Sequence, residues 1–171
     1  ANTYLKLFDS PSAWAVLQID NRNITDADYW SLRTSLAWSL ELDNELHDSL
    51  EKTLALRGTL NNADESLLIK LYRGSDPRRA LTMLIGSWQR QHDPLRLVEA
   101  LQQAQDLQDW PQVAALLKDA EQYPEANEQA DMLAIRGAHA LQQGQAEEAQ
   151  RLYQLGLSRY PDDNLFRERL M

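Results

Sequence analysis

Apolar residues recur along the chain at helical spacing. Leu32, Leu36 and Leu40 stand four residues apart, and the segment from Leu46 to Leu54 repeats the pattern. This spacing places the apolar side chains on one face of an α-helix. Continued to the C-terminal end, the pattern predicts helices at 11–20, 26–41, 44–57, 62–73, 77–91, 94–107, 110–122, 127–142 and 146–159, with a last one starting at 162.

Prolines and glycines mark where several of these helices begin and end. Three dipeptides join a capping side chain to a proline, which has no N–H to leave unpaired in the first turn: Ser10-Pro11, Asp76-Pro77 and Asp93-Pro94. Three glycines stand where we expect a left-handed residue to end a helix: Gly58, Gly74 and Gly144.

The predicted helices form pairs that recur. The turn inside each pair falls at Asp43, Asp76, Asp109 and Gln145, at intervals of 33, 33 and 36 residues. Short connections make neighbouring helices antiparallel, and a two-helix period in the low thirties is typical of helical repeat arrays. We predict one all-α solenoid of helical hairpins over 1–171, wound as a right-handed superhelix. Its repeats are expected at 27–59, 61–92, 94–126 and 130–162, with 1–24 a partial upstream repeat or a cap.

Composition and charge narrow the classes of function. The formal net charge of −9 and the presence of only four Lys disfavour a nucleic-acid role, which needs a basic footprint. The chain has no Cys, which excludes disulfides and thiolate chemistry within it. No apolar run approaches about 18 residues, so we expect no membrane span in this segment. The chain begins at Ala1 without Met, and we expect it to be a piece of a longer protein.

The segment from Met132 to Pro161 resembles a tetratricopeptide repeat. It carries the small residues, the turn glycine, the aromatic and the closing proline of that family at Gly137, Ala149, Gly156, Gly144, Tyr153 and Pro161. Small residues allow helix axes to approach, and the aromatic is expected to fill the gap between repeats. Arg136 departs from the pattern, because the family has an apolar residue there. The resemblance extends to residue 27 and weakens toward the N-terminal end.

A narrower resemblance suggests a biological setting. The segment from Ser75 to Leu81, within Leu-, Arg- and Gln-rich repeats, resembles the periplasmic repeat regions of Pel-type outer-membrane proteins that export bacterial exopolysaccharides. The resemblance implies a periplasmic scaffold that recruits a polymer-modifying enzyme, in a protein anchored in the outer membrane. Composition alone is equally compatible with the cytoplasm.

The family resemblance also implies where a partner binds. In such arrays the first helices of successive repeats line a concave face. The inward positions expected to contact a partner are Asp28, Trp38, Glu65, Tyr72, Arg73, Gln102, Asp106 and Asp131. We predict that Trp38, Tyr72 and Arg73 anchor it. Because four residues of this mixed set are acidic and Arg73 alone is basic, a basic or neutral polar partner is favoured over the acidic peptide tails bound by repeats with a cationic clamp.

Two groups of side chains are candidates for metal binding or catalysis. His47 and Glu51 lie one helical turn apart and would begin a metal site only with further ligands, so we interpret them as a helix-surface pair. The acidic segment 41–51, with Glu41 and Glu45, is interpreted as a solvated helix face. We therefore predict no metal, no cofactor and no catalytic residue.

Three hypotheses of function follow. The chain is a non-catalytic protein-binding scaffold in exopolysaccharide export; it binds a cationic or amino-sugar polysaccharide directly; or it is an enzyme that uses the acidic segment 41–51. The first agrees best with the repeats and with the lack of a catalytic motif.

Overall fold

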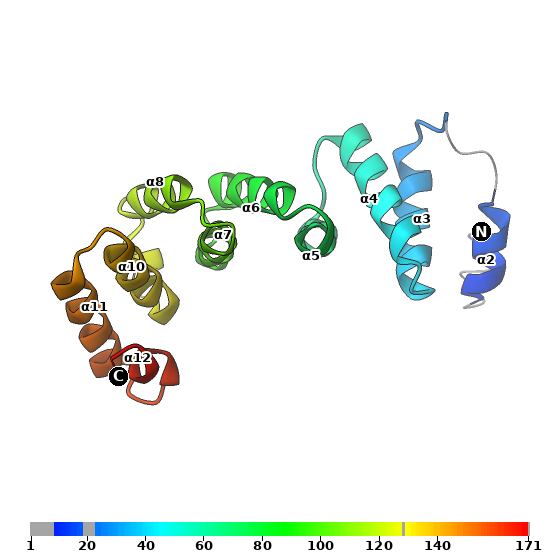
Figure 1. The fold of residues 1–171 in the computed structure, drawn as a ribbon. Helices are drawn as coiled ribbons and strands as arrows, with labels where there is room; N and C mark the ends of the chain where they lie inside the picture. The colour runs from blue at the N-terminus through cyan, green and yellow to red at the C-terminus, as the bar shows by residue number, and fades with distance from the viewer. Residues whose placement is uncertain (1–8, 19–22, 128, 171) are drawn as a thin grey trace. The chain divides into compact units, whose positions relative to one another are not determined.

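The computed structural model describes residues 9–18, 23–127 and 129–170, and these residues form helices joined by short connections (Figure 1). The all-α prediction is confirmed. The helices in these ranges are α2 Ser10–Val16, α3 Ala27–Ser39, α4 Asp43–Arg57, α5 Asn62–Ser75, α6 Pro77–Gln91, α7 Pro94–Asp106, α8 Trp110–Ala120, α9 Pro124–Asn127, α10 Ala130–Gln142, α11 Ala146–Arg159 and α12 Asn164–Leu170.

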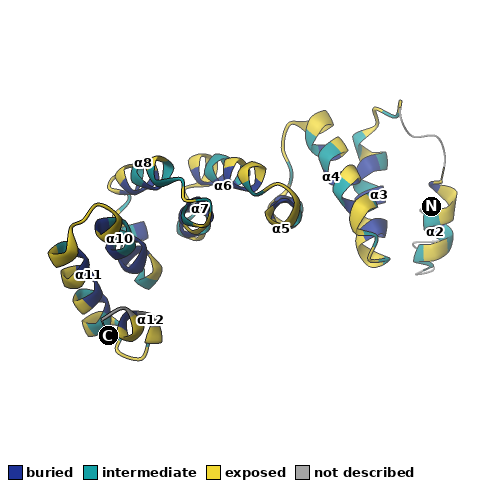
Figure 2. Cartoon of the chain, viewed as in Figure 1, coloured by how far each residue is buried: buried dark blue, intermediate teal, exposed yellow. Residues whose placement is uncertain are grey.

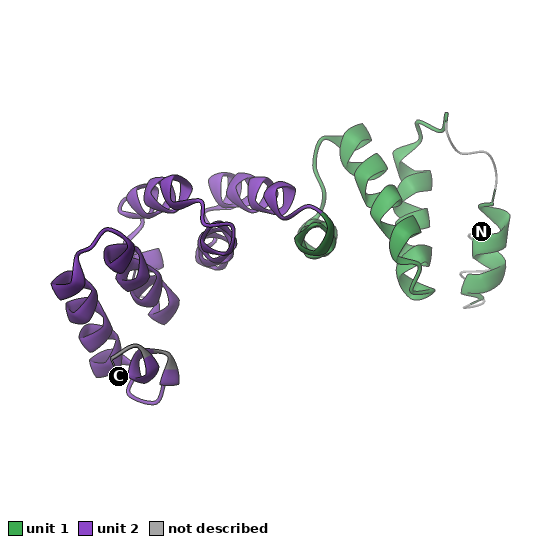
Figure 3. Ribbon diagram, in the orientation of Figure 1, with its two compact units in different colours: residues 1–75 green, residues 76–171 purple. Residues whose placement is uncertain are grey.

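The helices divide into two compact units (Figure 3). Unit 1 is Ala1–Ser75 and unit 2 is Asp76–Met171. The boundary falls inside the repeat predicted over 61–92, so the four repeat boundaries remain predictions, and each unit is described here by itself.

Unit 1 is built around the antiparallel pair α3 and α4. The pair buries Ala37, Leu46 and Leu50, as the dark faces of the helices show in Figure 2. The guanidinium of Arg33, buried on α3, forms an ion pair with Glu45 on α4. Because a buried charge is costly without a partner, this contact ties the two helices together.

Helix α2 covers the outer side of α3. Ala13, Leu17 and Leu36 form a small buried cluster, and the Tyr29 hydroxyl donates to the Leu17 carbonyl at 3.2 Å. Trp14 lies on Arg33, with 4.4 Å between its ring centroid and the guanidinium carbon. These contacts pack α2 on α3, and the assignment of 1–24 to a partial upstream repeat or a cap stays a prediction. Helix α2 ends at Val16, before the end of the helix predicted over 11–20, and residues 19 and 20 of that prediction lie outside the described residues.

In unit 2, helices α10 and α11 approach each other closely. A Cβ atom at Gly137 would lie 2.3 Å from Cε1 of the buried Tyr153 ring, and one at Gly156 would lie 2.2 Å from Phe166 on α12. Both glycines therefore stand where a neighbouring aromatic ring occupies the space of a side chain. This is the role that the sequence resemblance implied for Gly137. For Tyr153 it implied a place between repeats, whereas the ring packs on Gly137 within the repeat predicted over 130–162.

The observed helix ends differ from those predicted from the sequence in three places. Gly58 and Gly144 have φ of 75° and 73°, as predicted, but Gly74 continues α5 to Ser75, and α5 ends there before Asp76-Pro77. The helix predicted over 127–142 begins at Ala130, because Pro124 starts the separate turn α9. Asp9, and not Ser10, caps α2 by accepting from the Ser12 N–H at 3.1 Å, and hydrogen bonds from Ser12 hold the pKa of Asp9 below its usual value.

We expect Gly137→Ala to destabilise unit 2. The new methyl group meets the Tyr153 ring, which is buried and has no free space to move into, and such overpacking costs about 1–3 kcal/mol. Gly74→Ala is the matched control, because nothing lies within 4 Å of its Cβ position; replacing a helical glycine there should raise the free energy of unfolding by up to about 1 kcal/mol. Urea unfolding followed by circular dichroism measures both. Equal effects of the two changes would contradict the close approach of α10 and α11.

Candidate functional site

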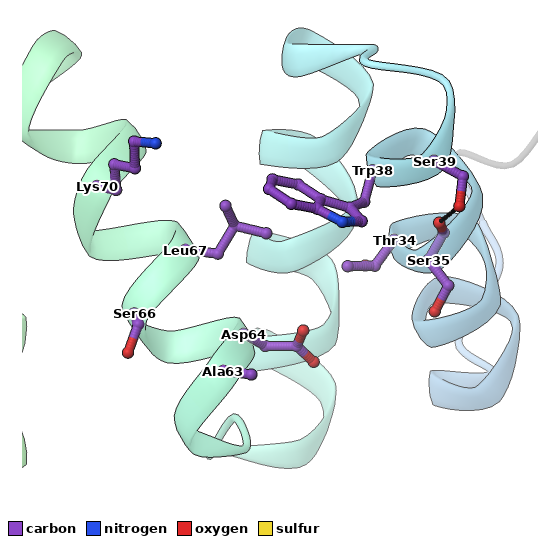
Figure 4. A pocket seen from close by; sticks show the side chains of 9 residues that line it. All are labelled: Thr34, Ser35, Trp38, Ser39, Ala63, Asp64, Ser66, Leu67 and Lys70. Atoms are coloured by element: carbon purple, nitrogen blue, oxygen red, sulfur yellow. Dashed lines mark hydrogen bonds between the residues drawn. The ribbon is translucent and has the colours of Figure 1, made fainter.

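A groove opens between α3 and α5 in unit 1 (Figure 4). Its volume is about 630 Å³, in the range of ligand-binding clefts. We call it the α3–α5 groove; it is lined by Thr34, Ser35, Trp38 and Ser39 of α3 and by Ala63, Asp64, Ser66, Leu67 and Lys70 of α5. Helix α5 packs on α4, and this packing leaves the groove open toward α3.

Trp38 is the dominant side chain of the α3–α5 groove. It lies in the last turn of α3 with 59% of its surface exposed, and Figure 4 shows its ring between α3 and α5, facing Leu67. Its neighbours Leu36 and Ala37 are buried, so the exposed indole follows from its position on the helix face opposite the core. An exposed tryptophan beside a leucine gives the groove an apolar centre.

Hydroxyl groups line the α3 side of the groove. Thr34 donates to the Trp30 carbonyl at 2.9 Å, Ser35 to Ser31 at 3.1 Å, and Ser39 to Ser35 at 2.9 Å. Each hydroxyl hydrogen is thus used within α3, so toward a further group each of these oxygen atoms can act only as an acceptor. This side therefore suits a ligand that carries N–H or O–H donors.

The α5 side of the groove carries one acidic and one basic residue. Asp64 accepts through Oδ2 from the Asn61 side-chain amide at 2.7 Å, and its own N–H donates to Asn61 Oδ1 at 2.9 Å. Lys70 is exposed, and among the described residues it has no ion-pair partner. Both charges thus face the groove from a single helix.

The predicted partner-binding residues are distributed over both units. Five lie in unit 1 and three in unit 2, where Gln102, Asp106 and Asp131 are exposed. Trp38 alone of the set lines the α3–α5 groove. Asp28 and Arg73 are exposed, and Asp28 accepts from Arg57 Nη2 at 2.6 Å. Partner binding by this set stays a prediction.

Glu65 and Tyr72 are buried, with 5% and 2% of their surfaces exposed. The Tyr72 hydroxyl donates to the Glu51 carboxylate on α4, and its ring meets the His47 ring edge-on at a centroid distance of 5.1 Å. The side chain predicted to anchor a partner thus holds α5 against α4. Because the ring is buried against α4, Tyr72 is not exposed to a ligand.

Among the lining residues that sequence reasoning missed are Asp64, Leu67 and Lys70. They follow one another at intervals of three residues, a spacing that keeps side chains near one another on a helix. That spacing was visible in the sequence. Which face of α5 stays uncovered was not visible, because this depends on how α5 packs on α4.

The residues considered for chemistry have structural contacts. His47 Nε2 lies 3.9 Å from Glu51 Oε1, and no group of three His, Asp or Glu within the described ranges is arranged to hold a metal ion. Glu45 forms the ion pair with Arg33, and Glu41 lies in the left-handed turn after α3 with φ of 56°. In unit 2, hydrogen bonds from the Arg151 guanidinium hold the pKa of Glu148 below its usual value.

A family comparison decides what kind of chain this is. The family model described as "Tetratricopeptide repeat" matches residues 1–171. The chain belongs to the tetratricopeptide repeat family.

A solved structure, that of YrrB, agrees on the fold. The tetratricopeptide repeat protein YrrB, titled "a TPR protein with an unusual peptide-binding site", is 17% identical over 98% of this chain and 87% of its own, with a TM-score of 0.66. PilW, a "widely conserved type IV pilus biogenesis factor", is 14% identical over 99% of this chain and 94% of its own, with a TM-score of 0.40. No curated protein matches the sequence.

Family membership gives a general function. Tetratricopeptide repeats are a fold of protein–protein interaction scaffolds, whose stacked helices form extended binding surfaces. None of the described helices combines the length and the apolar composition needed to cross a lipid bilayer.

We expect Tyr72 and Trp38 to differ sharply in their effect on folding. Tyr72→Ala removes a buried ring and should lower the free energy of unfolding by about 3–5 kcal/mol. Trp38→Ala removes an exposed ring and should change it by about 0.5 kcal/mol or less. Urea unfolding measures both; if Tyr72→Ala does not fold, Tyr72→Phe isolates the bond to Glu51, at about 1 kcal/mol. A larger loss for Trp38→Ala than for either change at Tyr72 would show that their roles are reversed.

Proposed function

We propose that this tetratricopeptide repeat chain is a non-catalytic scaffold that binds a segment of a partner protein in the α3–α5 groove. The observation that carries the proposal is the exposed indole of Trp38 over an open groove beside Leu67. Tryptophan is among the residues that contribute most to binding when a partner covers them. Its truncation typically costs about 2 kcal/mol or more of binding free energy. A partner segment that covers the indole removes its apolar surface from water.

A peptide is the ligand class that these features favour. The groove offers an apolar centre, hydroxyl oxygens that accept hydrogen bonds from backbone N–H groups, and one charge of each sign. The described binding of peptide by YrrB, a protein of the same fold, gives this class some further support.

The setting that we propose is bacterial exopolysaccharide export. The support is the resemblance of the Ser75–Leu81 segment and its surroundings to the periplasmic repeats of Pel-type exporters. In that setting the chain lies in the periplasm as part of a larger, outer-membrane-anchored protein, and the partner is a polymer-modifying enzyme. The alternative is direct binding of an amino-sugar polymer. Its support is the exposed indole of Trp38, because an exposed indole can stack on a sugar ring.

The proposal predicts that peptides selected by the chain depend on Trp38. We expect panning of a random peptide library on the purified chain to yield binders that lose at least about tenfold in affinity with Trp38→Ala, equal to about 1.4 kcal/mol. Leu56→Ala is the matched control, because Leu56 is also an exposed apolar residue of unit 1 but lies outside the groove. Fluorescence polarisation of labelled peptides measures the affinities.

A second arm separates protein from polymer. Isothermal titration of the chain with partially deacetylated amino-sugar oligomers, and with a purified polysaccharide-modifying enzyme from the same export system, should give Trp38-dependent binding of the enzyme alone. Trp38-dependent binding of the oligomers without the enzyme would favour the alternative. Peptide binders that are indifferent to Trp38→Ala would overturn the proposed site.

A further inference from the structure

The two charges of the α3–α5 groove stand at opposite ends of its α5 wall. Asp64 and Lys70 are six residues apart on α5, which separates their Cα atoms by about 9 Å along the helix axis. Leu67 stands midway between them, and Figure 4 shows Trp38 facing it from α3. The groove therefore runs from a negative end, across an apolar centre, to a positive end.

Both charged groups keep capacity for a ligand. The Asp64 carboxylate accepts a hydrogen bond from Asn61 through Oδ2. Its Oδ1 accepts no hydrogen bond from another described residue. Lys70 is exposed and, over the same part of the chain, forms no ion pair. The carboxylate is half-buried and oriented by Asn61, which fixes the position of the negative end.

A groove with this order of charges distinguishes the two directions of a bound chain. In one direction a basic side chain of the ligand meets Asp64 and an acidic one meets Lys70; in the other direction both pairs repel. An extended segment turns alternate side chains to one face, so three successive groove-facing positions span about 13 Å. Long basic and acidic side chains cover the difference from the separation on α5.

We propose that the α3–α5 groove binds extended partner segments of the pattern basic–x–apolar–x–acidic in a single direction, with the basic residue at Asp64, the apolar residue between Trp38 and Leu67, and the acidic residue at Lys70. This rests on the proposed function and adds to it the chemistry and the orientation of the partner. The mostly acidic charge of the chain alone favours a basic partner; Lys70 makes one acidic residue of the partner favourable at a defined position.

A library with fixed apolar centre and randomised flanks tests the proposal directly. We expect the unaltered chain to enrich Lys or Arg two residues before the apolar position and Asp or Glu two residues after it. Since exposed ion pairs contribute little individually, each pair should change affinity by about twofold to fivefold, and the forward peptide should bind about tenfold more tightly than its reversed-charge counterpart.

The charge-reversed variant Asp64→Lys/Lys70→Asp should enrich the opposite order, acidic before basic. The matched control is Asp48→Lys/Lys52→Asp on α4, which reverses one exposed charge of each sign outside the groove and should keep the original order. The neutral variant Asp64→Asn/Lys70→Gln should remove the preference for either order of charged residues in the selected peptides, without reversing it. Thermal unfolding followed by circular dichroism checks that each variant is folded.

The outcomes separate this inference from the function on which it rests. Inversion by the groove variant alone supports the proposal. Trp38-dependent binders with no preferred charge order, or an order that survives the Asp64/Lys70 reversal, overturn the direction and leave the scaffold intact. Absence of any Trp38-dependent binder overturns the proposed function itself.

Discussion

The structure depends on close packing between neighbouring helices, because the described residues contain no sheet against which a helix could bury its apolar face. A helical hairpin leaves part of that face uncovered until the next helix is added. At Gly137 the approach is so close that the Tyr153 ring occupies the space of a side chain. In unit 1, Arg33 and Glu45 join α3 to α4, and Tyr72 joins α5 to α4.

The candidate site is a consequence of this nearest-neighbour packing. Helix α5 is fixed to α4 by Tyr72, with its hydroxyl on Glu51 and its ring on His47. Held in this way, α5 leaves the groove open toward α3, and Trp38 stays exposed at its edge. Buried residues such as Tyr72 thus hold the helices together. The exposed residues of the groove, such as Trp38, are available to a partner.

Periodicity and capping were sufficient to predict the helices apart from the short α9, because both are local properties of the sequence. The close approach at Gly137 could also be expected, since small residues and an aromatic recur in the family pattern. Gly74 was predicted wrongly because a glycine ends a helix only where the backbone turns left-handed, and here α5 continues to Ser75. Trp38 could be identified from the sequence as a candidate binding residue. The burial of Tyr72 and the position of Asp64 and Lys70 along the groove could not be predicted, because both depend on how α5 packs on α4.

The central claim is that Trp38 is the contact point for a peptide, and the indole N–H signals of the five tryptophans report on it most directly. A two-dimensional ¹⁵N spectrum of the chain, assigned by single Trp→Phe changes, is recorded during titration with a selected peptide. The account predicts that the Trp38 indole signal shifts strongly, while those of the buried Trp30 and Trp88 stay in place. A saturable titration in which the Trp38 signal does not move would contradict it.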